Sequence, residues 1–261
     1  MIVSLLIAIV IIVGAISGYL FKSLTLSGAF AAILVGLSVN AGFGLNGLAL
    51  IGAFFVSSNY WSKYKSSVKR EIEEKLAKGG TRDWLQVFAN GGAASFFSLL
   101  YSFQHEQIWM LGFMVCLASA NSDTWASEIG SLSRKKPIYI RTFKRIERGT
   151  SGAISGLGTA AAFTGAFFIS ILSYLLFDTG IYVVMIVFLF GFIGNVLDTL
   201  FGAFFQQLYI CVECGITTEK KKHCQIPTKR IKGFTMVDND MVNFLSGFIA
   251  AVLSIVIFRF F

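Results

Sequence analysis

The sequence predicts an all-α polytopic membrane protein: a bundle of about seven to eight transmembrane helices in one domain, residues 1–261. The chain is 55% hydrophobic and only 14% charged, whereas about a quarter of the residues in soluble globular domains are charged. Its mean hydropathy is +0.72. Several apolar runs approach or exceed the ~18 residues that indicate a membrane-spanning helix.

The apolar segments can be placed in order along the chain. Residues 2–21 have no basic leader and no A-x-A-like cleavage site, which favours a retained first helix over a signal peptide. Residues 26–39 and 45–58 flank the glycine-rich NAGFG break, which suits two crossings joined by a tight hairpin, or a re-entrant pair. Further helices are expected at 84–103, at 108–122 continuing into an acidic motif, and at 149–176, 181–208 and 241–261.

Three polar segments separate these helices: an amphipathic segment at 59–83, a basic loop at 131–148 and a Cys/His loop at 209–237. They hold seven, seven and six of the 22 Lys and Arg residues. With eight crossings all three fall on one side, which the positive-inside rule makes cytoplasmic. We therefore expect a bacterial-type plasma membrane protein with both termini outside. The expected partner of its basic residues is the membrane and not a nucleic acid.

Acidic residues interrupt two of the apolar segments. Asp123 and Glu128 lie in the motif NSDTWASEIG, and Asp198 lies in GNVLDTLFGAFFQ. A carboxylate within a membrane helix is costly and marks a functional site by default. The alternative is that these polar faces only hydrogen-bond helices together, but three carboxylates exceed that need. Mg²⁺ is usually held by one or two carboxylates and substrate phosphates, so Asp123 and Asp198 are its predicted ligands. Asp123, Glu128 and Asp198 are the predicted catalytic residues.

Two glycine-rich stretches are candidate phosphate sites. Arg145 and Arg148 precede Gly149–Gly152, which we expect to open a helix whose free N–H groups bind phosphate. The alternative is an N-cap followed by small residues. The stretch KGGTRD is expected to be a second helix start of this kind, and the alternative is a basic loop. The polar residues at 238–243 either cap the last helix or contribute to the same cytoplasmic-side site. The predicted substrate- and phosphate-binding residues are Lys78, Arg82, Asn90, Asn121, Ser127, Arg145, Arg148, Gly149, Thr150, Ser151, Gly152, Asn195, Gln206 and Asn239.

The Cys/His loop has the spacing of a metal site. Cys211 and Cys214 form C-x2-C, followed by Cys224. These thiols, with His223 as a candidate fourth ligand, predict a structural zinc site. Free thiols are the alternative.

Six motifs occur in an order that resembles one known family. LSGAFAAILVG, KGGTRDWLQVFANGG, NSDTWASEIG, ERGTSGAISGLG, GNVLDTLFGAFFQ and CVECGITTE…HC resemble the integral-membrane family that includes plant phytyl-phosphate kinase and many bacterial members. SDTWASEIG is also similar to the acidic motif of CTP-dependent polyprenol kinases. The residues that match the family's polar positions are Asp123, Ser127, Glu128, Gly149, Thr150, Ser151, Gly152, Asp198 and Asn239.

The resemblance implies a Mg²⁺-dependent kinase that extends an isoprenoid monophosphate to the diphosphate. The expected partners are that lipid, a nucleoside triphosphate, with CTP as the first choice over ATP, and the membrane; a homo-oligomer is left open. A transporter or flippase of a phosphorylated lipid or anion is the alternative, because transporters also use intramembrane acids and broken helices. A structural partner that docks through its zinc loop is a third hypothesis.

Overall fold

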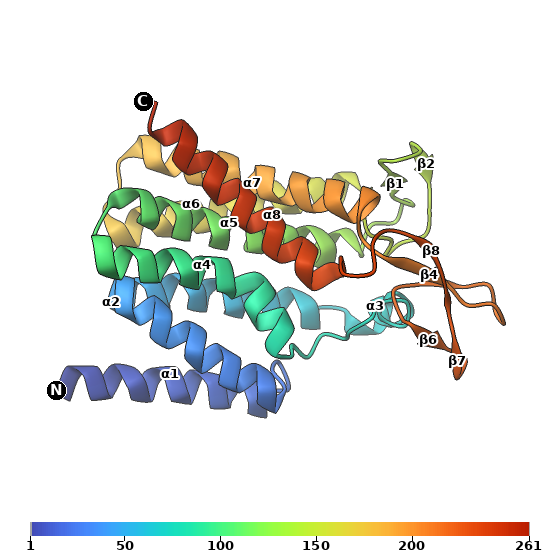
Figure 1. Ribbon diagram of the computed structural model, residues 1–261, viewed down its shortest axis with the longest axis horizontal. Coiled ribbons are helices and arrows are strands. Elements are labelled where there is room, and N and C mark those ends of the chain that lie inside the picture. Colours follow the sequence, from blue (N-terminus) through green and yellow to red (C-terminus); the bar gives the residue numbers. More distant parts are fainter. Residues whose placement is uncertain (1, 261) are drawn as a thin grey trace.

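The computed structural model, which describes residues 2–260, is a bundle of long helices with small strands at one end (Figure 1). α5 lies in the middle of the bundle and packs against α4, α6, α7 and α8. Its residues Phe113, Met114, Val115 and Leu117 are fully buried. The helices are α1 (Ile2–Leu20), α2 (Leu26–Lys63), α3 (Ser66–Glu73), α4 (Trp84–Gln104), α5 (Gln107–Gly130), α6 (Gly156–Phe177), α7 (Ile181–Phe204) and α8 (Asn239–Phe258).

Four of the described helices, α2, α6, α7 and α8, are long and apolar enough to cross a membrane. The outer faces of the bundle are apolar as well: Leu6, Val13 and Phe167 are all about half exposed or more. An apolar surface of this extent indicates a lipid environment. A membrane helix bundle is therefore supported, and the number of seven to eight crossings stays a prediction.

α2 is a hairpin rather than one straight rod. Gly44 has φ 54° and ψ −141°, a backbone conformation that interrupts the helix and suits glycine. Arg82 contacts both ends of α2: its carbonyl accepts a hydrogen bond from the Thr25 amide, and its guanidinium donates to the Asn59 side chain at 2.9 Å. The two halves of Leu26–Lys63 therefore run antiparallel, and the tight-hairpin interpretation of NAGFG describes the fold.

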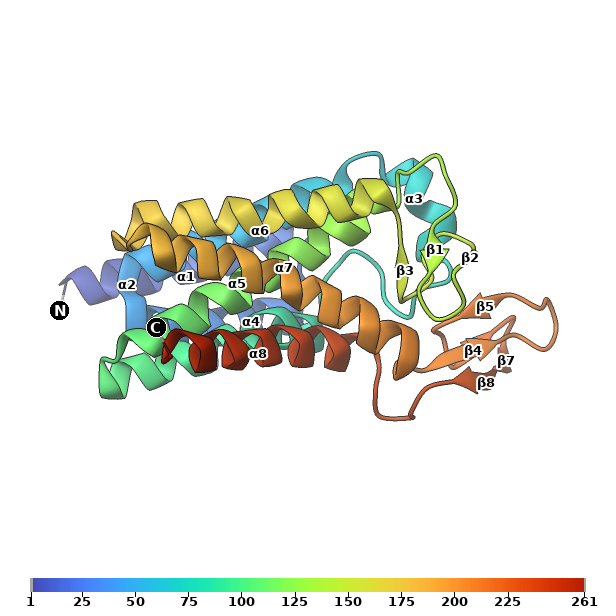
Figure 2. The ribbon, with the colours of Figure 1, turned by 90° about the horizontal axis from the view of Figure 1, so that it is seen from above.

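The polar segments gather at one end of the bundle, opposite the two termini (Figure 2). We call this the polar end; it carries α3 and all the strands. The all-α prediction omitted these strands, which are short, pair antiparallel and lie in the segments that connect the helices. Two three-stranded sheets have the orders β2-β1-β3 and β5-β4-β8, and β6 pairs with β7. The strands are β1 (Ile138–Tyr139), β2 (Lys144–Arg145), β3 (Ala153–Ile154), β4 (Leu208–Ile210), β5 (Thr217–Thr218), β6 (Lys222–His223), β7 (Ile226–Pro227) and β8 (Lys229–Lys232).

Two predicted helix boundaries are wrong. α6 begins at Gly156 and not at residue 149, because Gly149 and Gly152 have φ values of 79° and 83° that no right-handed helix accommodates. Ser155 instead caps α6, and its hydroxyl accepts the Gly158 amide at 3.0 Å. α7 ends at Phe204, before the predicted end at residue 208.

Candidate functional site

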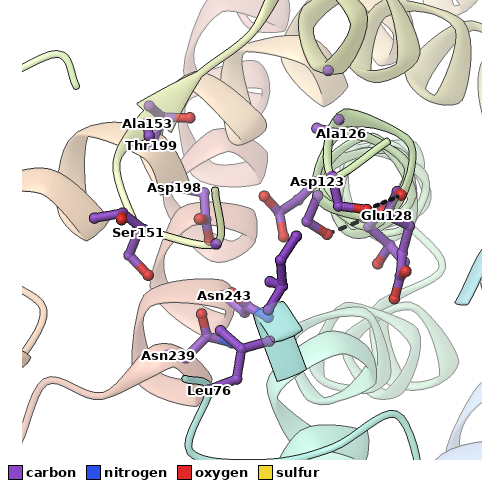
Figure 3. Close-up of a pocket in the computed structure, with 18 of the residues that line it drawn as sticks. Leu76, Asp123, Ala126, Glu128, Ser151, Ala153, Asp198, Thr199, Asn239 and Asn243 are labelled. Carbon is purple, nitrogen blue, oxygen red and sulfur yellow. Dashed lines mark hydrogen bonds between the residues drawn. The ribbon is translucent and has the colours of Figure 1, made fainter. Parts of the chain in front are cut away.

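A cavity of about 370 Å³ lies at the polar end (Figure 3). Six long helices contribute to its lining: the last turn of α2, the start of α4, the last two turns of α5, the start of α6, the second half of α7 and the start of α8. The short helix α3 lines it as well. Loops 76–80 and 148–155 cover the same space. Of the predicted site residues, the cavity is lined by Lys78, Arg82, Asn90, Asp123, Ser127, Glu128, Arg148, Gly149, Thr150, Ser151, Gly152, Asn195, Asp198 and Asn239.

Asp123 on α5 and Asp198 on α7 line the cavity from neighbouring helices (Figure 3). Asn195 lies one turn before Asp198 and donates its amide to Asp123 at 3.1 Å. Ser246 of α8 donates to Asp198 at 3.3 Å. The Asn243 amide faces Asp198 at 3.0 Å and donates to it when its nitrogen is turned inward. These neutral donors orient the two carboxylates without neutralising them, so both keep oxygen atoms for a cation.

Glu128, the predicted helper of the metal site, has charged and polar partners of its own. Its two carboxylate oxygens accept from Ser62 at 2.5 Å and from the ammonium of Lys69 at 2.6 Å. Lys69 is almost completely buried, and it also donates to the Trp61 carbonyl. A salt bridge thus occupies Glu128 within the cavity wall, and its catalytic role stays a prediction.

The oxygen donors that remain fit Mg²⁺ better than a softer metal. Asp123 and Asp198 supply carboxylates, and Asn195 and Asn243 supply amide oxygens on the same wall. Mg²⁺ is commonly held by one or two carboxylates together with substrate phosphates. Asp123 and Asp198 are therefore the residues that would hold it, and a third carboxylate is not needed.

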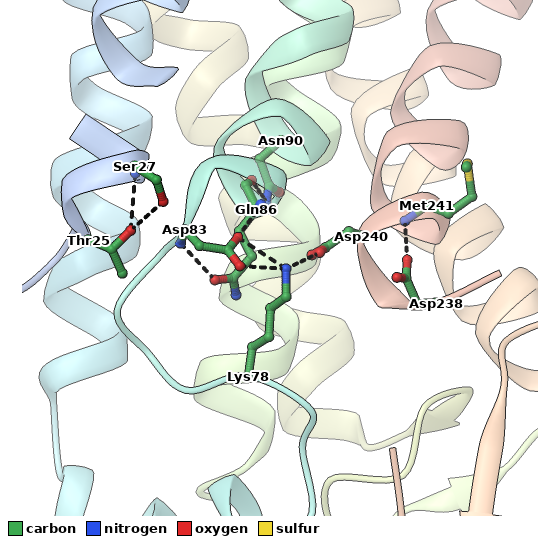
Figure 4. A network of polar contacts seen from close by, with 10 residues as sticks. Thr25, Ser27, Lys78, Asp83, Gln86, Asn90, Asp238, Asp240 and Met241 are labelled. Atoms are coloured by element: carbon green, nitrogen blue, oxygen red, sulfur yellow. Dashed lines mark hydrogen bonds and ion pairs between the residues drawn. The ribbon is translucent and has the colours of Figure 1, made fainter. Parts of the chain in front are cut away.

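Lys78 ties two helix starts together at the mouth of the cavity (Figure 4). Its ammonium lies 2.8 Å from Asp83 and 2.5 Å from Asp240. Burial alone would lower the pKa of Lys78, but the two carboxylates outweigh it and raise that pKa. Asp83 also caps α4 in a reciprocal capping box with Gln86. The KGGTRD stretch therefore leads into a helix start, as predicted, with Lys78 already paired.

The loop that precedes α6 lines the cavity as a turn rather than as a helix N-terminus. Gly152 packs so closely against α7 that a Cβ atom there would lie 2.4 Å from the Ala203 Cα. Gly149 packs equally closely on Ile72. The predicted phosphate site at 149–152 therefore has to rely on turn amides, hydroxyl groups and Arg148, and not on a helix dipole.

Glu219 connects this loop to the Cys/His segment. It accepts hydrogen bonds from Ser151 at 2.9 Å and from Gln206 at 2.8 Å. Burial raises the pKa of the Glu219 carboxyl, although these bonds and the nearby Lys232 oppose the shift. Burial also lowers the pKa of Lys232 to about 8. A partly buried acid and a partly buried base thus lie beside the cavity loop.

Three predicted substrate-binding residues lie outside the cavity lining. Asn121 is fully buried, and its side chain links α5 to α2 and α6. It accepts a hydrogen bond from the Ser57 hydroxyl and donates one to the Gly165 carbonyl. Gln206 follows the end of α7 and points to Glu219. Arg145 is exposed on β2 and donates to a loop carbonyl. Substrate binding by these three residues stays a prediction, and in this arrangement none of them reaches the cavity lining.

The structure also adds residues that the sequence patterns did not single out: Lys69, Glu219, Asp83 and Ser62 all line the cavity or contact its lining. Lys69 belongs to a surface-like amphipathic segment, and no local pattern distinguishes it from the neighbouring lysines. Asp83 was recognisable as an N-cap before an apolar run. Cys211, Cys214, His223 and Cys224 come together in the β4–β7 region, away from the cavity lining.

Comparisons with known proteins identify relatives across almost the whole chain. Protein PGR of Arabidopsis thaliana is 32% identical over 276 residues, covering 94% of this chain and 93% of that protein. Protein VTE6, chloroplastic, from the same plant is 27% identical and covers 94% of this chain and 68% of that protein. The uncharacterized membrane protein MJ0933 of Methanocaldococcus jannaschii is 40% identical over 140 residues, covering 52% of this chain and 58% of that protein.

No solved structure matches the chain. The family described as integral membrane protein DUF92 matches residues 8–251. With this match and the full-length similarity to Protein PGR, the chain belongs to the DUF92 family of integral membrane proteins.

Proposed function

We propose that this protein is a membrane kinase that transfers a phosphoryl group from a nucleoside triphosphate, with CTP as the preferred donor, to an isoprenoid monophosphate. The observation that carries the proposal is the pair of carboxylates, Asp123 and Asp198, in a cavity that also contains basic side chains. The motif resemblance to the family that includes phytyl-phosphate kinase supports the same reaction.

The cavity supplies what phosphoryl transfer requires, which is mainly positioning and charge neutralisation. Arg82 and Arg148 both line it and can contact anionic oxygens. Mg²⁺ held by Asp123 and Asp198 would neutralise charge on the donor phosphates. The acceptor phosphate is already an oxyanion, so the protein needs no strong general base to activate it.

An apolar groove next to the cavity fits the lipid part of the acceptor. It runs along the start of α6 and is lined by Ile138, Ile154 and Phe163, all of which are exposed. Ile154 and Thr159 line both the groove and the cavity. An isoprenoid chain on this outer face of α6 would leave its phosphate at the polar end, beside the carboxylate pair.

The location of the cavity favours a kinase over a transporter. Its lining comes from the polar ends of the helices and from loops, whereas transporter sites lie near the bilayer midplane at broken helices. The helix break at Gly44 contributes no residue to the cavity.

The test uses purified protein in detergent with Mg²⁺, γ-³²P-labelled CTP or ATP, and a panel of isoprenyl monophosphates. Labelled diphosphate is expected, and Asp123→Asn and Asp198→Asn should each lower turnover by roughly 100- to 1000-fold. Asp178→Asn is the matched control, because Asp178 is exposed at the C-cap of α6, far from the cavity lining.

Full activity of both cavity variants would refute the role of the carboxylate pair. Absence of product across the panel, with folded wild-type protein, would refute the kinase assignment. Nucleotide-independent passage of a phosphorylated lipid across vesicles would then support the transporter.

A further inference from the structure

We infer that Cys211, Cys214, His223 and Cys224 form a tetrahedral zinc site that holds Glu219 in place against the two loops of the cavity. The four candidate ligand atoms all lie within 4.8 Å of one another. The His223 Nδ1 atom is 3.4 Å from the Cys214 sulfur and 3.2 Å from the Cys224 sulfur. Zinc–ligand bonds of 2.0–2.3 Å in a tetrahedron place ligand atoms roughly 3.5–3.8 Å apart, so this cluster already has almost the required spacing.

The backbone around the first two cysteines has the turn that a zinc knuckle needs. The Gly215 amide donates to the Cys211 carbonyl at 2.9 Å, and the Cys211 amide donates to the Ile216 carbonyl at 2.9 Å. Gly215 has φ 72°, which favours glycine directly after the second cysteine. These bonds fold the C-x2-C-G segment so that both thiols face the same point.

A second turn brings the adjacent His223 and Cys224 to that point. β6 and β7 pair as a hairpin in which His223 lies opposite Ile226. Cys224 and Gln225 form its two-residue connection and have φ values of 49° and 62°. Positive φ at both central residues is the property of a type I′ hairpin turn. This turn resolves how two neighbouring residues can both serve as ligands.

The donor set selects the metal. Three thiols and one imidazole are the ligands of structural zinc, whereas Mg²⁺ prefers oxygen. All four cysteines of the chain are free thiols, and the fourth one, Cys116, is buried in the bundle. Among the side chains that the structure describes, no other group of three or more Cys, His, Asp or Glu residues converges in this way.

The site also explains how Glu219 is positioned. β5 follows the C-x2-C turn and pairs with β4, which ends immediately before Cys211. The next residue, Glu219, donates its amide to the Lys75 carbonyl at 2.9 Å and accepts from Ser151 at 2.9 Å. One residue therefore joins the loop after α3 to the loop before α6, and both loops line the cavity. Zinc would hold together the turns on either side of that residue.

The experiment measures two quantities on the whole chain in detergent: its zinc content, and the protection of the two cavity loops from hydrogen exchange. Neither readout depends on the proposed reaction. Wild-type protein purified without chelator should contain about one zinc ion per chain. Cys211→Ser and Cys224→Ser should each reduce the content to near zero, and Cys116→Ser should retain it. Cobalt-substituted wild type should show the visible absorption of a tetrahedral thiolate site, which keeps the test valid if a cysteine variant fails to fold.

Hydrogen exchange then tests the link to the cavity. Removal of zinc by a chelator should increase amide exchange in residues 75–80 and 149–152, with little change in α7. Glu219→Gln should retain zinc and increase exchange in the same two loops. Metal-free wild type, or zinc retained in a Cys211→Ser/Cys224→Ser double variant, would overturn the site. Unchanged exchange in both loops after zinc removal would overturn the positioning of Glu219.

Discussion

Removing the ammonium of Lys69 is expected to destabilise the fold strongly, because it removes the ion-pair partner of Glu128. The Lys69 and Glu128 side chains are only 4% and 24% exposed, and their charged atoms are 2.6 Å apart. Breaking a buried ion pair by removing one partner costs about 3–5 kcal/mol. Because Glu128 keeps some access to solvent, we expect about 3 kcal/mol for Lys69→Met, which is a change of more than 100-fold in the unfolding equilibrium.

A double-mutant cycle in detergent measures this directly as the free energy of unfolding. Glu128→Gln alone should also destabilise, since it leaves the buried Lys69 ammonium bonded to the uncharged Trp61 carbonyl and without its carboxylate partner. The double variant Lys69→Met/Glu128→Gln should recover to within about 1 kcal/mol of wild type, because neither member of the ion pair remains charged. A coupling energy below about 0.5 kcal/mol would refute the ion-pair assignment. Wild-type stability with abolished turnover in Glu128→Gln would instead restore its predicted catalytic role.

Three further predictions concern the loops and the groove. Gly152→Ala should destabilise by about 2 kcal/mol or more, because of its positive φ and close packing, whereas Gly80→Ala, with open space around it, should change little in thermal unfolding. The folded chain should release the Lys232 proton near pH 8, before the unfolded chain does near pH 10.5. Wild-type stability should therefore rise with pH between these values relative to Lys232→Met. Ala160 also lines the apolar groove, so Ala160→Trp should fill it and raise KM for the lipid acceptor but not for the nucleotide. Leu175, which is exposed on α6 outside the groove lining, is the control, and Leu175→Trp should change neither KM.

Several parts of the site were predictable from the sequence because they depend on local pattern. Asp123 and Asp198 interrupt apolar helices, where an unpaired carboxylate is costly, and both line the cavity. Gly44 lies within the predicted break between two apolar runs and reverses the chain. The C-x2-C spacing marked one half of a converging Cys/His cluster. In each case the signal lies within about a dozen neighbouring residues.

The features that local patterns describe least well are those whose partner is distant in the sequence. Glu128 resembled a catalytic acid, and its counter-ion Lys69 lies 59 residues away on a short polar helix. Asn121 shares the helical face of Glu128, but its amide bonds α2 and α6 instead of a substrate. Gly149 was expected to open a helix, whereas its positive φ places it in a turn and its close packing on Ile72 leaves no room for a Cβ atom.

The sequence by itself determined the membrane character of the chain, the helical segments and the segregation of basic residues into three loops. Hydropathy and periodicity are properties of short sequence windows, so a prediction from them does not require knowing which segments pack together in the fold. Only the tertiary structure decided which acids remain unpaired, which loops cover the cavity, and that Glu219 connects the Cys/His loop to them. Those outcomes depend on pairing between groups far apart in the chain, since the energy of a buried charge is set by the partner that reaches it.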